Sequence, residues 1–292
     1  MSMRVSQFNT YNMTSFNLNQ LQGKEAQQRM QLSTGKQFIY NSEDPNKANQ
    51  SMVIKSSINQ VDQYQKNISD TQESLKTVES ILSSATDILQ KAKEEGLKAS
   101  NGTYNERDRN TFASVIEESI KQMVTLSNSQ HLGKYLFSGE KTQTEPYTYN
   151  GTTVTYNGDA DLLKTKVSPY LDVQTSVDGE QTFRQVFNSL ISLRDTVKTN
   201  DTSQIATALK DVDTALNNTV DTRASIGVNL ESLKMLDENY NAEKLSLDTR
   251  LSSIEDVDFT KVIMEYTQTQ QIHQGMLAAT KKMFDVSLIN YL

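Results

Sequence analysis

The sequence predicts a mainly α-helical protein, in which N- and C-terminal arms form a long antiparallel coiled coil or bundle and a small antiparallel β domain is inserted in the middle. Three observations support this fold class. Only 36% of the 292 residues are hydrophobic, whereas compact domains usually contain about 45–50%, so a thick single core is not expected. Five of the 11 glycines and two of the three prolines lie within residues 133–179. An apolar heptad repeat runs along the first arm.

The heptad repeat predicts one long helix over residues 45–100. Asp44 is expected to cap this helix and Pro45 to occupy its first turn, and Asn101-Gly102 should end it. A second helix over residues 105–129 would then complete an antiparallel helical hairpin. The apolar positions that recur every seven residues are Ile54, Val61, Ile68, Leu75, Leu82 and Leu89.

The middle of the chain has the pattern of short β-strands. Residues 147–158 contain two runs rich in Tyr, Thr and Val on either side of Asn150-Gly151, which is a strong hairpin signal. Residues 171–177 alternate between apolar and polar side chains, as expected for a half-buried strand. The sequence therefore predicts a small antiparallel sheet between the two helical arms.

The second arm returns to helical periodicity. Residues 183–198 and 205–254 are predicted as helices of a mixed bundle, followed by a last helix from about Phe259 to the C-terminus. The first 40 residues resemble this last helix, because both carry apolar side chains at helical spacing among Asn and Gln,.

The two terminal helices are expected to pair with each other and to bury their apolar stripes against other subunits. Isolated helices are only marginally stable without such burial, so the ends should fold on assembly. The candidate assembly residues are Phe8, Met13, Phe16, Leu21, Met30, Leu32, Phe259, Ile263, Tyr266, Met276, Leu277, Met283, Phe284 and Leu288.

Composition and motifs argue against most catalytic and metal-binding classes. The chain has no cysteine and two histidines, His131 and His273, and it contains no zinc-protease, phosphate-loop or dinucleotide-binding motif,. We interpret His273 as a packing or surface residue. Glu255, Asp256 and Asp258 could hold a cation, but a helix start is the better interpretation, because carboxylates are favoured at the positive end of the helix dipole. We expect no catalytic residue, no cofactor and no metal.

Charge and hydropathy also restrict the partners. A net charge of −7 and an isoelectric point of about 5.0 argue against binding to a nucleic-acid backbone. No apolar stretch approaches the ~18 residues of a transmembrane helix, and the first residues lack the apolar core of a secretory signal. We expect neither nucleic-acid binding nor membrane insertion.

Several short motifs resemble those of the bacterial flagellin superfamily. RMQLSTGK at residues 29–36 and NSEDP at residues 41–45 are similar to its N-terminal signature, and SIEDVD at residues 253–258 to its C-terminal motif. The Glu-Asp-Pro form and the Met-Arg-Val-Ser start resemble the hook–filament junction branch of the superfamily more than flagellin itself. The motif residues considered are Ser33, Gly35, Asn41, Ser42, Asp44, Pro45, Ser253, Asp256 and Asp258.

The resemblance implies a non-enzymatic structural subunit of the flagellum. It implies export in an unfolded state from the cytoplasm, followed by assembly outside the cell as a layer between the first hook-associated protein and the flagellin filament. Its partners would be copies of itself, these two neighbours and a cytoplasmic export chaperone. The chaperone would bind the C-terminal region that contains Ile263, Leu277 and Phe284.

The resemblance also implies three domains. Residues 1–44 and 258–292 would form an inner terminal domain, residues 45–132 and 183–257 a long-helix bundle, and residues 133–182 an outer β-rich domain.

Three alternatives remain at this stage. The chain could be a minor flagellin, which the Glu-Asp-Pro form and the start of the chain disfavour. It could be a secreted coiled-coil adhesin whose β domain binds a host ligand, which would not explain the matched terminal stripes. An enzyme within the insert is the third, although those residues carry no catalytic motif.

Overall fold

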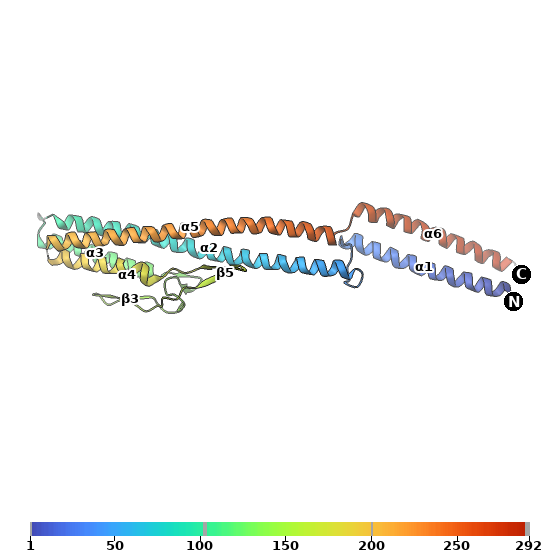
Figure 1. Cartoon of the computed structure of the whole chain (residues 1–292), viewed down its shortest axis with the longest axis horizontal. Coiled ribbons are helices and arrows are strands. Elements are labelled where there is room, and N and C mark those ends of the chain that lie inside the picture. The colour runs from blue at the N-terminus through green and yellow to red at the C-terminus, as the bar shows by residue number, and fades with distance from the viewer. Residues whose placement is uncertain (1, 102–103, 200, 290–292) are drawn as a thin grey trace. The chain divides into compact units, whose positions relative to one another are not determined.

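The computed structural model describes the backbone of residues 2–101, 104–199 and 201–289, and the side chains of residues 9–282 within those ranges. Most described residues are helical, which confirms the predicted fold class (Figure 1). Two compact units are present, residues 61–242 and residues 1–60 with 243–292. The helices are α1 (Ser2–Thr34), α2 (Pro45–Ser100), α3 (Glu106–Ser127), α4 (Gly179–Thr199), α5 (Thr202–Glu255) and α6 (Phe259–Ile289).

The predicted helix boundaries are confirmed where side chains can cap the backbone. Oδ1 of Asp44 accepts a hydrogen bond from the backbone N–H of Lys47 across 3.1 Å, so α2 begins at the predicted cap. Asn105 caps α3 in the same way, because its Oδ1 accepts from the N–H of Asp108 across 2.9 Å. Such side chains satisfy N–H groups that have no partner within the helix. Asn101-Gly102 was predicted to end α2, and Gly102 lies outside the described residues.

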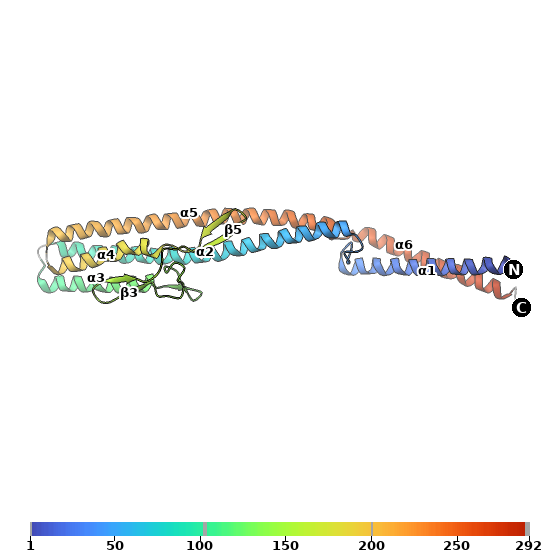
Figure 2. The same ribbon diagram turned by 60° about the horizontal axis from the view of Figure 1, so that its bottom comes forward.

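In the unit of residues 61–242, the heptad positions of α2 form the core. Val61, Ile68, Leu75, Leu82 and Leu89 are all buried. Helices α3 and α4 run beside α2 and α5 in both views (Figures 1 and 2), which makes a four-helix arrangement.

A glycine lets three of these helices approach closely. A Cβ atom on Gly96 of α2 would lie 2.9 Å from side-chain carbons of both Leu193 on α4 and Leu209 on α5. Any larger residue at this position would require the side chains of those leucines to move.

The middle of the chain forms three separate two-stranded antiparallel ribbons. The predicted hairpin is confirmed as β3 (Tyr147–Tyr149) and β4 (Val154–Tyr156). Its turn uses both predicted residues, because Oδ1 of Asn150 accepts from the N–H of Thr152 and Thr153, and Gly151 has a φ of +89°. The other ribbons pair β1 (Gln130–His131) with β2 (Lys134–Tyr135) and β5 (Lys164–Ser168) with β6 (Leu171–Gln174).

Arg194 of α4 holds the tip of the β3–β4 ribbon against the helices. Its buried guanidinium donates to the carboxylate of Glu117 across 2.8 Å and to the hydroxyl of Tyr149 across 2.7 Å, and its Nε donates to Asp195 across 2.8 Å. Burial, together with the hydrogen bond to Glu117, raises the pKa of Tyr149 to about 12. Tyr149 therefore stays a neutral hydrogen-bond donor at physiological pH.

The unit of residues 1–60 and 243–292 contains α1, α6 and the adjoining ends of α2 and α5. Helices α1 and α6 run antiparallel beside each other (Figure 2), so the two terminal segments pair as expected. Within the described residues, no helix is both long and apolar enough to cross a membrane.

Candidate assembly interface

The N-terminal and C-terminal motifs lie side by side where α1 leads toward α2 and α5 leads into α6. We call this region the elbow. Lys36 and Asp256 form an isolated antiparallel β-bridge. The N–H of Gln37 donates to the carbonyl of Glu255 across 2.6 Å, and the N–H of Val257 donates to the carbonyl of Gly35 across 2.9 Å. The chain thus passes from α1 toward α2, and from α5 into α6, through two short segments that hydrogen-bond to each other.

Gly35 explains why the N-terminal motif needs a glycine. Its φ of +71° lies in the left-handed region, where a side chain would strain the backbone. This turn ends α1 and brings Lys36 into the elbow.

A buried carboxylate fixes the elbow electrostatically. Glu255 is 6% exposed and accepts hydrogen bonds from the hydroxyl of Ser51 and the ammonium of Lys55, and Nζ of Lys36 lies 3.1 Å from its other oxygen. Burial acts to raise the pKa of this carboxyl, but the hydrogen bonds from Lys55, Ser51 and Lys36 outweigh burial and hold the pKa below its usual value. We call Lys36, Ser51, Lys55 and Glu255 the elbow clasp.

The three acidic residues of the C-terminal motif have separate roles. Glu255 belongs to the elbow clasp, and Asp256 lies 2.8 Å from Nζ of Lys36, a hydrogen bond that lowers its pKa. Oδ1 of Asp258 accepts from the N–H of Lys261 across 3.1 Å and so caps α6. Among the described residues, no group of three or more His, Asp or Glu side chains is arranged to hold a metal ion.

The remaining motif residues are less constrained. Ser33, Asn41 and Ser42 are exposed, and the hydroxyl of Ser253 donates to the carbonyl of Arg250 across 2.7 Å. Lys36, Ser51 and Lys55 were missed by the sequence analysis. A lysine or serine in a polar segment carries no periodic signal, so only the fold reveals that these three meet Glu255.

The apolar stripes of α1 and α6 remain largely uncovered. On α1, Met13 is 69% exposed and Phe16 60% exposed, and on α6 Ile263 and Leu277 are 52% and 50% exposed. The other candidate residues differ: Met30 and Phe259 are exposed, Leu21, Leu32, Tyr266 and Met276 are half-buried, and the side chains of Phe8, Met283, Phe284 and Leu288 lie outside the described residues.

Polar side chains occupy part of the seam between α1 and α6. Glu25, Gln28 and Thr269 are buried, and Nδ1 of His273 donates to Oε1 of Glu25 across 3.1 Å. Several apolar side chains of the same helices thus face outward while polar ones face the partner helix. Several large apolar side chains exposed on one pair of helices are typical of an interaction surface.

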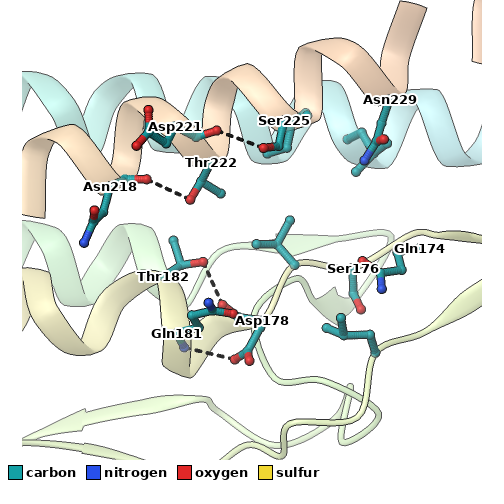
Figure 3. Close-up of a pocket in the computed structure, with 14 residues that line it drawn as sticks. Gln174, Ser176, Asp178, Gln181, Thr182, Asn218, Asp221, Thr222, Ser225 and Asn229 are labelled. Atoms are coloured by element: carbon teal, nitrogen blue, oxygen red, sulfur yellow. Dashed lines mark hydrogen bonds between the residues drawn. The ribbon is translucent and has the colours of Figure 1, made fainter. Parts of the chain in front are cut away.

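The unit of residues 61–242 contains a groove of about 480 Å³ (Figure 3). Its wall is mostly amides and hydroxyls, and its two carboxylates are Asp178 and Asp221. Oδ1 of Asp178 accepts from the N–H of Gln181 across 3.0 Å and its carbonyl from the hydroxyl of Thr182 across 2.7 Å (Figure 3). Asp178 therefore serves as the cap of α4, and the groove lining brings together no nucleophile and base in the manner of a hydrolase.

Comparisons with known proteins identify the family to which this chain is related. The family described as the bacterial flagellin N-terminal helical region matches residues 5–142, and the bacterial flagellin C-terminal helical region matches residues 209–292. Flagellar hook-associated protein 3 of Salmonella typhimurium strain LT2 is 26% identical over 312 aligned positions, covering 98% of each chain. The protein of that name from Escherichia coli strain K12 is 27% identical over 286 positions, covering 88% of this chain and 90% of the relative.

A solved structure shares the fold. The crystal structure of FlgL from Bacillus cereus superposes with a TM-score of 0.61 at 22% identity, over 68% of this chain and 99% of that one. The chain therefore belongs to the flagellin family, is a structural component of the flagellum rather than an enzyme, and is similar to flagellar hook-associated proteins.

Proposed function

We propose that this chain forms the layer that joins the hook to the flagellin filament, and that it is needed for filament assembly and motility. It would be exported unfolded and would contact copies of itself, the first hook-associated protein and flagellin. Full-length similarity to hook-associated proteins supports this role. The observation that carries it is the exposed apolar face of the α1–α6 pair, which includes Met13, Phe16, Ile263 and Leu277.

An open helical array of subunits would supply the apolar contacts that the exposed face of the α1–α6 pair lacks in the monomer. In a helical array one surface of a subunit meets a different surface of its neighbour, so contacts propagate without closing. Burying half-exposed Ile or Leu side chains contributes roughly 25 cal/mol per Å² of apolar area. That gain offsets the loss of conformational entropy when the terminal helices become ordered.

The three domains keep their proposed roles within this layer. Residues 1–44 and 258–292 would line the inside, residues 45–132 and 183–257 would form the surrounding long-helix layer, and residues 133–182 would project outward. Before export, the chaperone would cover the region of Ile263 and Leu277, which are exposed on α6. Phe284, the third candidate contact, has no described side chain.

A gene deletion distinguishes the junction role from that of a minor flagellin. A strain without this chain should release flagellin into the medium as unassembled subunits, because the filament would have no layer on which to grow. Electron microscopy of cells measures the number and length of filaments, and immunoblotting of the medium measures the released flagellin. Filaments of normal number and length on the deletion strain would contradict the proposal and favour a minor flagellin.

Complementation of that strain tests the apolar face itself. The double substitution Ile263→Asp and Leu277→Asp should be produced and exported but should not restore filaments. The matched control is Gln270→Asp with Gln274→Asp, which adds the same charge to exposed positions of the same helix without removing apolar area. Restored motility with the first variant would argue against this face as the assembly surface.

A further inference from the structure

The seam between α1 and α6 contains a cluster of polar side chains that the proposed junction role does not explain. Glu25 and Gln28 of α1 are 9% and 3% exposed, and the side chain of His273 on α6 is 18% exposed. Nδ1 of His273 donates to Oε1 of Glu25 across 3.1 Å. We call Glu25, Gln28 and His273 the polar layer.

Two members of the polar layer are incompletely satisfied. Both amide atoms of Gln28 and Nε2 of His273 are buried, and no described residue offers them a hydrogen-bond partner. Burying polar atoms without partners is unfavourable. The polar layer therefore makes the pair weaker than an apolar seam at the same positions would be.

The hydrogen bond between Glu25 and His273 favours one register of the α1–α6 pair over others. Since the helices are antiparallel, a slip of α6 by one turn would place Thr269 or Met276, the neighbouring covered positions of α6, opposite Glu25 in place of His273. Neither fits: the hydroxyl of Thr269 already donates to the carbonyl of Glu265 across 2.8 Å, and the thioether of Met276 cannot donate a hydrogen bond. A slipped register would thus bury the Glu25 carboxylate without its partner, at a higher cost than the native pairing.

We propose that the bond between Glu25 and His273 selects the register in which α1 and α6 pair, and that Gln28 weakens the pair without selecting it. Single buried polar residues are known to fix register and partner number in coiled coils at the expense of stability. A defined register matters here because the apolar side chains of both helices then form one fixed outer face. The inference holds equally for a junction protein and for a filament subunit, so its failure would not bear on the proposed function.

Disulfide scanning can read the register, since the chain contains no native cysteine. A cysteine replacing Leu21, one turn before Glu25, is combined with single cysteines at each of residues 274–280 of α6. The scan is made on the full chain, both purified and assembled on cells of the deletion strain. In the native background one position should cross-link at least about tenfold more than positions one turn away, as a lost buried hydrogen bond predicts.

Two variants separate the selection of a register from the stability of the α1–α6 pair. With Glu25→Leu and His273→Leu together, the preference should fall to about twofold, and cross-links should spread over positions a turn apart. With Gln28→Leu, the single preferred position should remain and amide exchange of both helices should slow. A single preferred position in the Glu25→Leu, His273→Leu variant would overturn the proposal. A spread of cross-links in the assembled native chain, or none in either state, would overturn it as well.

Discussion

The helices of residues 61–242 and the α1–α6 pair differ in what they bury. Along α2, heptad positions such as Leu82 and Leu89 are fully buried against neighbouring helices of the same chain. Along α1 and α6, Glu25 and Gln28 are buried while Phe16 and Leu277 are at least half exposed. The first region completes its apolar core within one chain, and the second does not. Sequence periodicity alone describes both as amphipathic, so the difference lies in which face finds a partner.

The largest effect on the stability of the monomer should come from the long-helix core. Leu89→Ala should lower the free energy of unfolding by about 2–5 kcal/mol, because it removes buried apolar contacts and leaves a cavity. Urea denaturation followed by circular dichroism measures this loss. A change below about 0.5 kcal/mol, the range of ordinary surface substitutions, would mean that this seam is not the core.

A comparable effect is expected at the buried cation of the same unit. Arg194→Met should cost about 1–3 kcal/mol, because it leaves the part-buried Glu117 without its charged hydrogen-bond partner,. Hydrogen exchange should then increase selectively in residues 147–156, which Arg194 holds to the helices. The control is Arg184→Met: the ion pair of Arg184 with Glu180 is exposed and should contribute at most about 1 kcal/mol. Equal losses in the two variants would refute the anchoring role.

The elbow clasp should respond to acid. The pKa of Glu255 is lowered in the folded chain, so its contribution is fully present above the ordinary value of about 4.3. The contribution is lost as the pH falls through the lower folded pKa. Amide exchange at residues 37 and 257, corrected for its intrinsic pH dependence, should therefore rise below about pH 4.

The variant Glu255→Gln serves as the control for this pH dependence. It should lose that acid response and destabilise the elbow by about 1–3 kcal/mol at neutral pH, because an amide cannot replace the charged hydrogen bonds from Lys36 and Lys55. The same acid response in the variant would assign the effect to another group.

The smallest effect on the monomer is expected on the exposed face. Leu277→Ala should change the free energy of unfolding by less than about 0.5 kcal/mol, although the same substitution should weaken assembly. Comparing Leu277→Ala with Leu89→Ala shows the effect of the same truncation at an exposed leucine and at a buried leucine. A monomer destabilised equally by both would show that α6 already packs against its own chain.

The sequence was sufficient for the features that depend on local chemistry. The heptads of α2, the cap Asp44 and the Asn150-Gly151 turn follow from side-chain spacing and backbone preference, and all are present. Strand β5 was missed, because its one buried residue, Val167, lies between polar neighbours and gives no strand pattern. The elbow clasp and the polar layer were also missed, since each joins residues 200 or more positions apart. Such pairings depend on the chain topology, which spacing does not report.

Hydrogen exchange of the full chain, purified as a monomer and assembled on the flagellum, tests most directly whether the terminal helices need other subunits. The account predicts rapid exchange within α1 and α6 in the monomer, slow exchange along the buried face of α2, and strong protection of both terminal helices after assembly. Terminal helices that are as protected in the solitary monomer as in the assembled state would contradict it.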